Sequence, residues 1–180
     1  MMNKICISIG DIDGIGIRIL LKLYKEKKIK NFILFTNKSI FLKFLQKVKI
    51  SINTNIINKD INKFNYNQNK FNIYNFDSKN KNLNTILSIK YSYIFCLKQK
   101  QKGIITLPVN KSIIKKDLRN FIGHTEYFEY LDKTKISNMI FIYRNIIISP
   151  LTTHIPLNKI IKKIKSKNFI FDKLNKLNRS

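Results

Sequence analysis

The first fifty residues repeat one pattern twice, a short apolar stretch followed by a segment with helical spacing of apolar residues. Lys4–Ile9 (KICISI) is apolar and β-branched, which is typical of a buried strand. In Ile17–Lys28, apolar residues recur at helical spacing and the end is cationic, as helix C-termini prefer. Asn31–Thr36 (NFILFT) and Ile40–Val48 repeat the pair as a second strand and a second amphipathic helix. A β-α-β-α opening predicts a mainly parallel sheet with helices on its faces.

The rest of the chain continues the pattern with less contrast. The stretch from Ser51 to Asn80 is rich in Asn and alternates weakly, which we interpret as irregular strands and a hairpin. The further expected elements are, in chain order, a helix over Asn84–Gln101, a strand over Ile104–Leu107, a short helix over Lys111–Lys116, a helix over Glu126–Lys133, two strands over Asn138–Tyr143 and Asn145–Ser149 that form a hairpin, and a helix over Asn158–Lys165. An apolar piece near the end, Phe169–Phe171, is suited to contact a partner.

Length and composition restrict the class of protein. A chain of 180 residues with 44% hydrophobic residues is long enough and apolar enough for a globular core. No run of about 18 apolar residues occurs, so we expect no membrane span. Asp11 and Asp13 interrupt the apolar N-terminus, which argues against a secretory signal. Cys6 and Cys96 lack the spacing of metal ligands and fit buried thiols in a reducing cytoplasm.

The net charge of +25 raises the question of a nucleic-acid partner. Only four of the 35 basic residues are arginines, and the lysines are scattered along the whole chain. Base reading and bidentate phosphate contacts depend on Arg, whose planar group lysine cannot imitate. About half of the residues are Ile, Asn or Lys, the amino acids of AT-rich codons, and Ala is absent. We therefore favour a solvated lysine surface and expect no nucleic-acid partner, with a lysine-rich nucleic-acid-binding protein as the alternative from another class.

Against this biased background, Gly, Pro and His gather in four short islands: GDIDGIG, GIITLPVNK, IGHTE and SPLTTHIPL. The first, Gly10–Gly16, joins a strand to a helix, and glycines there allow backbone N–H groups to approach an anion. Its spacing matches neither the Rossmann fingerprint nor a Walker A loop. A tight turn without a ligand accounts for these residues equally well.

The two histidines occupy the third and fourth islands. His124 and Thr125 stand side by side where the chain enters a helix, which suits them to hold a phosphate or a carboxylate. The alternative is that Thr125 only caps the helix, with Glu126 favouring its first turn. His154 follows a strand, and at that position it could ligate a divalent metal or act as a general base. One histidine does not make a metal site.

Taken together, ISIGDIDGIG, TLPVNK, GHTEYF and THIPL resemble, in order and separation, the motifs of 4-hydroxythreonine-4-phosphate dehydrogenases. The resemblance extends from Ile7 to about Leu157. The chain departs from the usual wording at Ile12 and Asp13, which replace Pro and Ala, and at Leu107, which replaces Gly.

The resemblance implies a fold and a function. The fold would be an α/β fold like that of isocitrate and isopropylmalate dehydrogenases, with a mixed, mostly parallel sheet. The chain would contain a truncated form of this fold. Residues from 1 to about 120 would form the first domain, and residues from about 121 to 180 the start of a second. The family's activity is the NAD-dependent oxidation and decarboxylation of 4-phosphohydroxy-L-threonine in pyridoxal phosphate biosynthesis. Enzymes of this family use a divalent metal (Zn, Mg or Co) and work as homodimers in the cytoplasm.

Carried over by motif, His124 and Thr125 would bind the substrate, and His154 would be a metal ligand. Asp11 and Lys111 match motif positions without an assigned role. Family members are nearly twice as long, and the additional half would supply two further metal-binding histidines. We therefore expect this chain alone to be inactive, as a fragment, as half of a two-chain enzyme or as a remnant. A decarboxylase of another phosphorylated hydroxy acid would share the same islands. The central expectation is that His124, Thr125 and His154 converge at one concave site.

Overall fold

The computed structural model describes residues 4–58, 65–101, 103–118, 121–133, 138–152, 155–165 and 167–178. Its internal contacts divide the chain into two compact units, Met1–Leu131 and Asp132–Ser180, which we describe separately. The assignment of residues 1 to about 120 and about 121 to 180 to two domains of a dehydrogenase stays a prediction.

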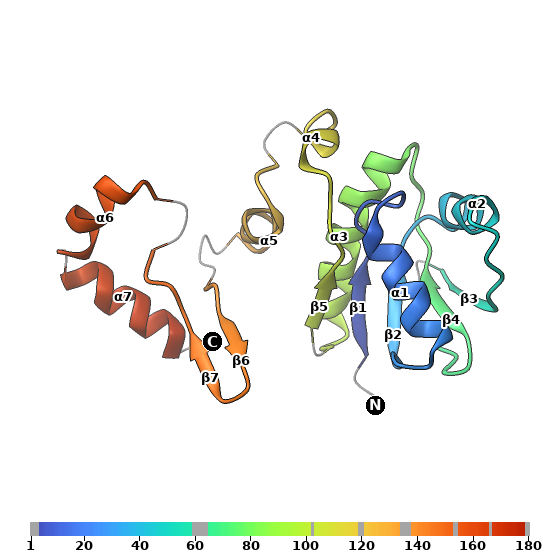
Figure 1. The fold of residues 1–180 in the computed structure, drawn as a ribbon, viewed down its shortest axis with the longest axis horizontal. Helices are drawn as coiled ribbons and strands as arrows, with labels where there is room; N and C mark the ends of the chain where they lie inside the picture. Colours follow the sequence, from blue (N-terminus) through green and yellow to red (C-terminus); the bar gives the residue numbers. More distant parts are fainter. Residues whose placement is uncertain are drawn as a thin grey trace. The chain divides into compact units, whose positions relative to one another are not determined.

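The first unit is built on a parallel sheet of five strands (Figure 1). The strands follow one another across the sheet in the order β3-β4-β2-β1-β5. All four neighbouring pairs are parallel. Their bounds are β1 (Ile5–Ser8), β2 (Phe32–Phe35), β3 (Thr54–Ile57), β4 (Phe71–Tyr74) and β5 (Gly103–Thr106). This arrangement confirms the expected α/β fold with a mostly parallel sheet.

Helices cover both faces of the sheet. Helices α1 (Ile15–Lys25) and α2 (Lys38–Lys47) lie on one face, and α3 (Lys81–Lys98) lies on the other (Figure 1). Successive strand residues point to opposite faces, so Ile7 belongs to the core under α1 and α2, and Cys6 to the core under α3. The second core also contains aromatic rings from three elements, namely Phe35, Tyr74 and Phe95.

The expectation of a hairpin within residues 51–80 is wrong, because β3 and β4 run parallel, with Thr54 opposite Phe71. All four residues of β4 are buried, so this strand lacks the alternation of a strand with one exposed face. Its polar member, Asn72, is satisfied by a local turn: its Nδ2 donates to the carbonyls of Asn67 and Lys70 at 2.7 and 2.9 Å.

Asparagine side chains fix the carboxyl-terminal edge of the sheet. Asn37 caps α2, with its Oδ1 accepting from the N–H of Ile40 at 3.1 Å. The fully buried Asn84 of α3 accepts from the Asn37 N–H at 2.7 Å. Asn80 caps α3 in the same manner, accepting from the Leu83 N–H at 2.8 Å. These bonds fix the starts of two helices at the edge where parallel sheets place their sites.

Two shorter helices complete the first unit. They are α4 (Lys111–Ile114) and α5 (His124–Asp132). The residues around them pack on α3 through a separate apolar cluster, whose buried members are Ile86, Ile89, Ile114 and Phe121. This cluster gives the start of α5 a fixed place relative to α3.

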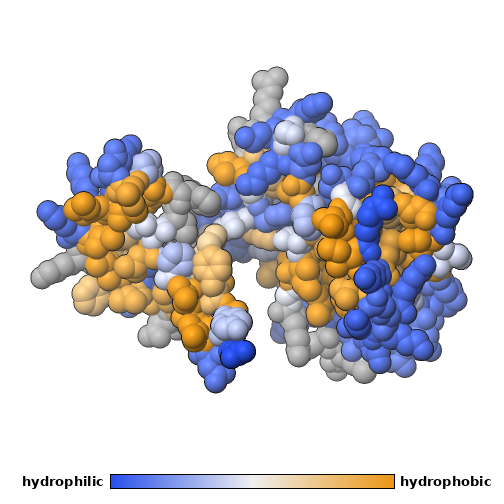
Figure 2. Space-filling view, in the orientation of Figure 1, coloured by the Kyte–Doolittle hydropathy of each residue, from blue (hydrophilic) through white to orange (hydrophobic). Residues whose placement is uncertain are grey.

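The second unit contains an antiparallel hairpin and two helices: β6 (Phe141–Tyr143), β7 (Ile146–Ile148), α6 (Leu157–Ile164) and α7 (Lys167–Asn178). The hairpin turns at Arg144 and Asn145, which confirms the prediction from the sequence. All six strand residues are exposed although each is apolar or aromatic. Figure 2 shows this apolar surface in orange on the hairpin.

Among the described residues, no helix combines the length and apolarity that crossing a membrane requires. Both cysteines are free thiols, with Cys6 buried and Cys96 half-buried. They share a hydrogen bond, and burial raises the pKa of each, so both thiols stay protonated near neutral pH.

Candidate functional site at the carboxyl ends of strands β1 and β5

The turn that follows β1 is fastened to the turn that follows β5. The N–H of Asp11 donates to the carbonyl of Pro108 at 2.9 Å, and the N–H of Leu107 donates to the carbonyl of Ser8 at 3.2 Å. From α3, the hydroxyl of Thr85 donates to the carbonyl of Gly10 at 2.6 Å. The first and second islands of the sequence therefore form one structure at the carboxyl ends of adjacent strands.

The glycines of the first island are explained by this close contact between the two turns. Gly10 has a φ of +64°, and a Cβ there would lie 2.5 Å from the carbonyl oxygen of Pro108. A Cβ on Gly16 would lie 2.7 Å from Cδ of Pro108. Of the two interpretations left open by the sequence, a tight packed turn therefore accounts for both glycines. The turn does not offer the open backbone cradle of a dinucleotide-binding loop.

A small cavity of about 160 Å³ lies beside this joint. Its polar lining comes from three elements of the sheet edge: the β1–α1 turn, α3 and the end of the β5–α4 turn. The lining residues are Asp11, Ile12, Asp13, Lys81, Asn82, Thr85, Asn110 and Ile114. Asp11 also accepts a hydrogen bond from the Asp13 N–H at 3.0 Å, which stiffens the turn.

Asp13 is the acidic centre of a lysine-rich rim. Its carboxylate pairs with Lys81 and, at 3.3 Å, with Lys47. The hydrogen bond from Lys81 is the largest cause that lowers the pKa of Asp13, followed in the same direction by Lys47. The carboxylate is 42% exposed, so solvent screens the pairs and they stabilise the fold only slightly. Their effect is to keep Asp13 ionised at the edge of the cavity.

The third island meets the end of the second one at Lys111. A Cβ on Gly123 would lie 3.6 Å from Nζ of Lys111 and 2.8 Å from Oε2 of Glu126. The charge of Lys111 also lowers the pKa of His124, while that of Glu126 raises it. Lysine, histidine and glutamate thus share one small region at the start of α5.

His124 is the most unusual group of this region. Its Nε2 is buried and has no hydrogen-bond partner among the residues that the structure describes, and its ring packs edge-to-face on Phe121 with centroids 6.2 Å apart. Burial is the main cause that lowers the pKa of His124, so the ring is neutral near pH 7. A buried polar atom without a protein partner is costly in a folded protein, unless a water, an ion or a ligand completes its hydrogen bonding.

The alternative reading of Thr125 as the helix cap is wrong, because α5 begins at His124 and Thr125 lies within its first turn. Glu126 does lie in the first turn, where a carboxylate suits the helix dipole. His154 lies outside the described residues. The convergence of His124, Thr125 and His154 therefore stays a prediction, as does the metal-binding role of His154.

Three residues of the site were missed from the sequence: Thr85, Asn110 and Lys81. A signal for Thr85 does exist, because small polar residues recur in α3 at helical spacing at Thr85, Ser88 and Ser92. All three are buried, and the two serines donate to carbonyls of their own helix at 2.8 and 2.9 Å. Such a stripe marks the helix face that packs closely against the sheet.

Within the described part of the chain, no group of three or more His, Cys, Asp or Glu residues is arranged to hold a metal ion. The whole sequence contains only two histidines. Two histidines are too few for a site with three histidine ligands within this chain.

The pyridoxal phosphate biosynthetic protein PdxA family model matches residues 28–180. A 4-hydroxythreonine-4-phosphate dehydrogenase of Campylobacter fetus is 28% identical over 170 residues, which cover 93% of this chain and 53% of that protein. The enzyme of the same name from a Sulfurihydrogenibium species is 27% identical, with 99% of this chain and 58% of that protein covered. The chain thus spans about half the length of these curated relatives.

Solved structures give the same result for the fold. A 4-hydroxythreonine-4-phosphate dehydrogenase from Burkholderia phymatum superimposes with a TM-score of 0.74 at 18% identity, covering 97% of this chain and 57% of that one. The Klebsiella pneumoniae enzyme gives 0.72 at 18% identity, with 89% and 54% covered. The likeness confirms the expected dehydrogenase-like α/β fold.

Proposed function

The chain belongs to the pyridoxal phosphate biosynthetic protein PdxA family, and we propose that it forms the substrate-binding half of a 4-hydroxythreonine-4-phosphate dehydrogenase. The reaction oxidises the 3-hydroxyl of 4-phosphohydroxy-L-threonine to a ketone, with the hydride passing to NAD. The resulting β-keto acid loses its carboxylate as carbon dioxide and leaves 3-amino-2-oxopropyl phosphate.

One observation supports this proposal above the others, the buried and unpartnered Nε2 of His124 close to Lys111. A neutral ring supplies one donor or one acceptor, and the lysine supplies a positive charge. The N–H groups in the first turn of α5 add donors for an anion. His124, Thr125 and Lys111 would therefore hold a phosphorylated, hydroxylated substrate, and the low pKa of His124 keeps its ring neutral for this role.

The proposed reaction needs NAD and a divalent metal. A divalent metal, when bound, would polarise the hydroxyl oxygen and the forming carbonyl. In this chain His154 would be one ligand, and the remaining ligands must come from outside it. We propose no NAD-binding residues in the glycine turn after β1, because Leu107 and Pro108 occupy the space beside its glycines.

The partner of this half would be a second copy of the chain, or a polypeptide that corresponds to the remaining length of the relatives. The exposed hairpin favours such a partner, because Phe141, Ile142 and Ile147 are 57%, 72% and 68% exposed. Contiguous apolar surface of this kind is typical of interfaces. A cytoplasmic location agrees with the two free, protonated thiols.

The experiment compares the chain alone with the chain plus the C-terminal half of the Sulfurihydrogenibium relative. With 4-phosphohydroxythreonine, NAD and Mg²⁺, we expect NADH formation only in the mixture. Binding of the substrate to the chain alone is measured by calorimetry. His124→Ala and Lys111→Ala should weaken it about tenfold, as expected for losing a bond to a charged group.

Lys115→Ala is the matched control for Lys111→Ala, since Lys115 is exposed just after α4 and should leave binding unchanged. NADH formation by the chain alone would refute its proposed incompleteness. Equal binding by the Lys111 and Lys115 variants, or no binding by any form, would refute the proposed site. A panel of other phosphorylated hydroxy acids tests the choice of substrate.

A further inference from the structure

A second and larger pocket lies at the opposite edge of the sheet from the candidate site. It is formed at the amino ends of β2 and β4, beside the end of α1, and has a volume of about 620 Å³. Because all five strands are parallel and four residues long, about 13 Å of sheet separates the two edges. The pocket therefore cannot be a part of the site at the carboxyl ends.

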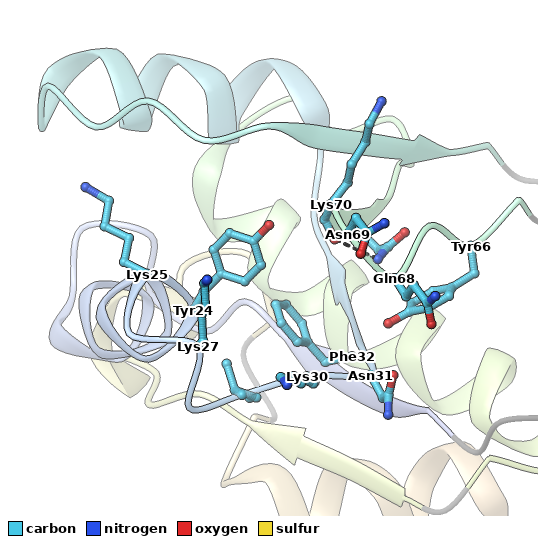
Figure 3. Close-up of a pocket in the computed structure, with 12 residues that line it drawn as sticks. Tyr24, Lys25, Lys27, Lys30, Asn31, Phe32, Tyr66, Gln68, Asn69 and Lys70 are labelled. Carbon is cyan, nitrogen blue, oxygen red and sulfur yellow. Dashed lines mark hydrogen bonds between the residues drawn. The ribbon is translucent and has the colours of Figure 1, made fainter.

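The walls of this pocket combine aromatic rings with lysines and amides (Figure 3). Tyr24, from α1, and Tyr66, from the segment before β4, approach from opposite sides. Tyr24 is held by edge-to-face contacts with Phe32 and Phe71, whose centroids lie 6.0 and 5.0 Å away. Lys4 lies 4.7 Å from the centroid of Tyr66. Ring packing therefore holds Tyr24 in place, whereas Tyr66 contacts the amino group of Lys4.

The charged side chains that are described in the lining of the pocket are positive. Among the described residues that line it, four are lysines and none is acidic; the lysines are Lys25, Lys27, Lys30 and Lys70. The amino groups of Lys25 and Lys70 extend outward at the rim (Figure 3). Amide side chains of Asn31, Gln68 and Asn69 complete the lining and can both donate and accept hydrogen bonds.

We propose that this pocket binds a small nucleotide, whose base contacts the rings of Tyr24 and Tyr66 and whose phosphates lie near the lysines of the rim. The volume falls within the range of about 300–1,000 Å³ that is usual for small-ligand sites. Stacking on an aromatic ring accepts any base, and amide groups match the mixed donor and acceptor edge of a base. Flexible lysines suit phosphate groups as point charges. The proposal does not depend on the dehydrogenase activity.

The competing explanation for the lysines is a polycationic surface that binds any anion. The aromatic rings distinguish a nucleotide pocket from such a surface. A lysine surface binds by charge alone, so diphosphate would bind as tightly as ADP. A pocket with aromatic walls binds ADP more tightly than diphosphate, because the base adds contacts that diphosphate lacks.

The test is calorimetric titration of the full chain with ADP, adenosine and diphosphate at low and moderate salt. We expect ADP to bind at least about tenfold more tightly than diphosphate. Tyr66→Ala should lower the affinity for ADP about tenfold, whereas Tyr66→Phe, which keeps the ring, should retain it. Lys70→Ala should lower the affinity and reduce its dependence on salt.

Lys90→Ala provides the matched control, because Lys90 is exposed on α3 and does not line the pocket. It removes the same charge and should leave ADP binding unchanged. Thermal unfolding of each variant verifies that it is folded, and Lys70→Ala remains informative if Tyr66→Ala does not fold. Equal affinities for ADP and diphosphate, or equal losses in the Lys70 and Lys90 variants, would overturn the proposal. The proposal would also be overturned if an oligonucleotide bound more tightly than ADP and the Tyr66→Ala substitution left that binding unchanged.

Discussion

The ring of Pro108 occupies the space in which a side chain at Gly16 would stand, since a Cβ on Gly16 would lie 2.7 Å from Cδ of Pro108. Residues 92 positions apart thereby meet without any room between them. The contact joins the first turn of α1 to the turn after β5. It explains why a residue without a side chain is needed inside this helix, where glycine ordinarily weakens the structure.

Gly16→Ala should therefore destabilise the protein, although Ala is the better helix former. Forcing a methyl group into filled space costs about 1–3 kcal/mol, which exceeds the gain in helix propensity of about 1 kcal/mol. Urea unfolding followed by circular dichroism measures the free energy of unfolding. Gly103→Ala is the control, because a Cβ there meets nothing within 4 Å. An Ala at position 16 that stabilises the chain would contradict the packing that we describe.

The hydroxyl of Thr85 leads to a second prediction for the same joint. It donates to the buried carbonyl of Gly10, so Thr85→Val should leave that carbonyl without a partner and lower the free energy of unfolding by about 1–3 kcal/mol. Thr85→Ser keeps the hydroxyl and should cost less. The two variants are compared by denaturant unfolding under identical conditions. If Thr85→Val is as stable as the unmodified chain while Thr85→Ser is destabilised, then the methyl group, and not the hydrogen bond, matters at this position.

The elements that the sequence predicts best are those with strong local signals. The strand Ile5–Ser8 and the helix Ile15–Lys25 follow from apolar periodicity and a glycine turn, and both lie where expected. The stretch that contains β4 is expected to form irregular strands, but its parallel pairing with β3 is not expected, because both faces of β4 are buried and Asn72 is satisfied by its own turn. A buried strand gives no alternation, and hydrogen bonds to a turn cannot be read from periodicity.

In the candidate site, too, local sequence signals could be read and long-range contacts could not. The islands contain His124 and Lys111, which lie close together near the start of α5, and the binding roles of both residues stay predictions. They could not show that Gly16 meets Pro108 or that Thr85 reaches Gly10, because these contacts join segments that are distant in sequence. Contacts of this kind depend on the order of the strands in the sheet. The aromatic pocket at the opposite edge has no motif at all.

The lowered pKa of His124 predicts how stability changes with pH. In the unfolded chain its pKa is about 6.5, and in the fold it is lower, mainly through burial. Between these two values the unfolded chain binds more protons, so stability rises with pH across this window. The stabilisation is complete above about pH 6.5 and is lost as the pH falls toward the folded pKa.

His124→Gln should flatten this part of the profile of stability against pH, measured as urea midpoints at a series of pH values. Lys111→Ala should raise the pKa of His124 and so narrow the window, because Lys111 lowers that pKa. Lys115→Ala removes an equal charge nearby and should leave the window in place. A histidine variant with the same acid dependence as the unmodified chain would mean that His124 is not a buried neutral group.

The exposed hairpin predicts association. Ile147 is 68% exposed in β7 and lies opposite Ile142 of β6. Burying such a side chain stabilises a complex by about 1.5–3 kcal/mol, so Ile147→Thr should weaken binding to a second copy or to the C-terminal half of a relative about tenfold or more. Thr keeps the β-branched shape that strands favour.

Sedimentation velocity with and without the added half measures the effect. Ile105→Thr, in β5 and 44% exposed, is the matched control. If the unmodified chain stays monomeric and binds no such half, or if both variants lose the same affinity, the hairpin is not the interface.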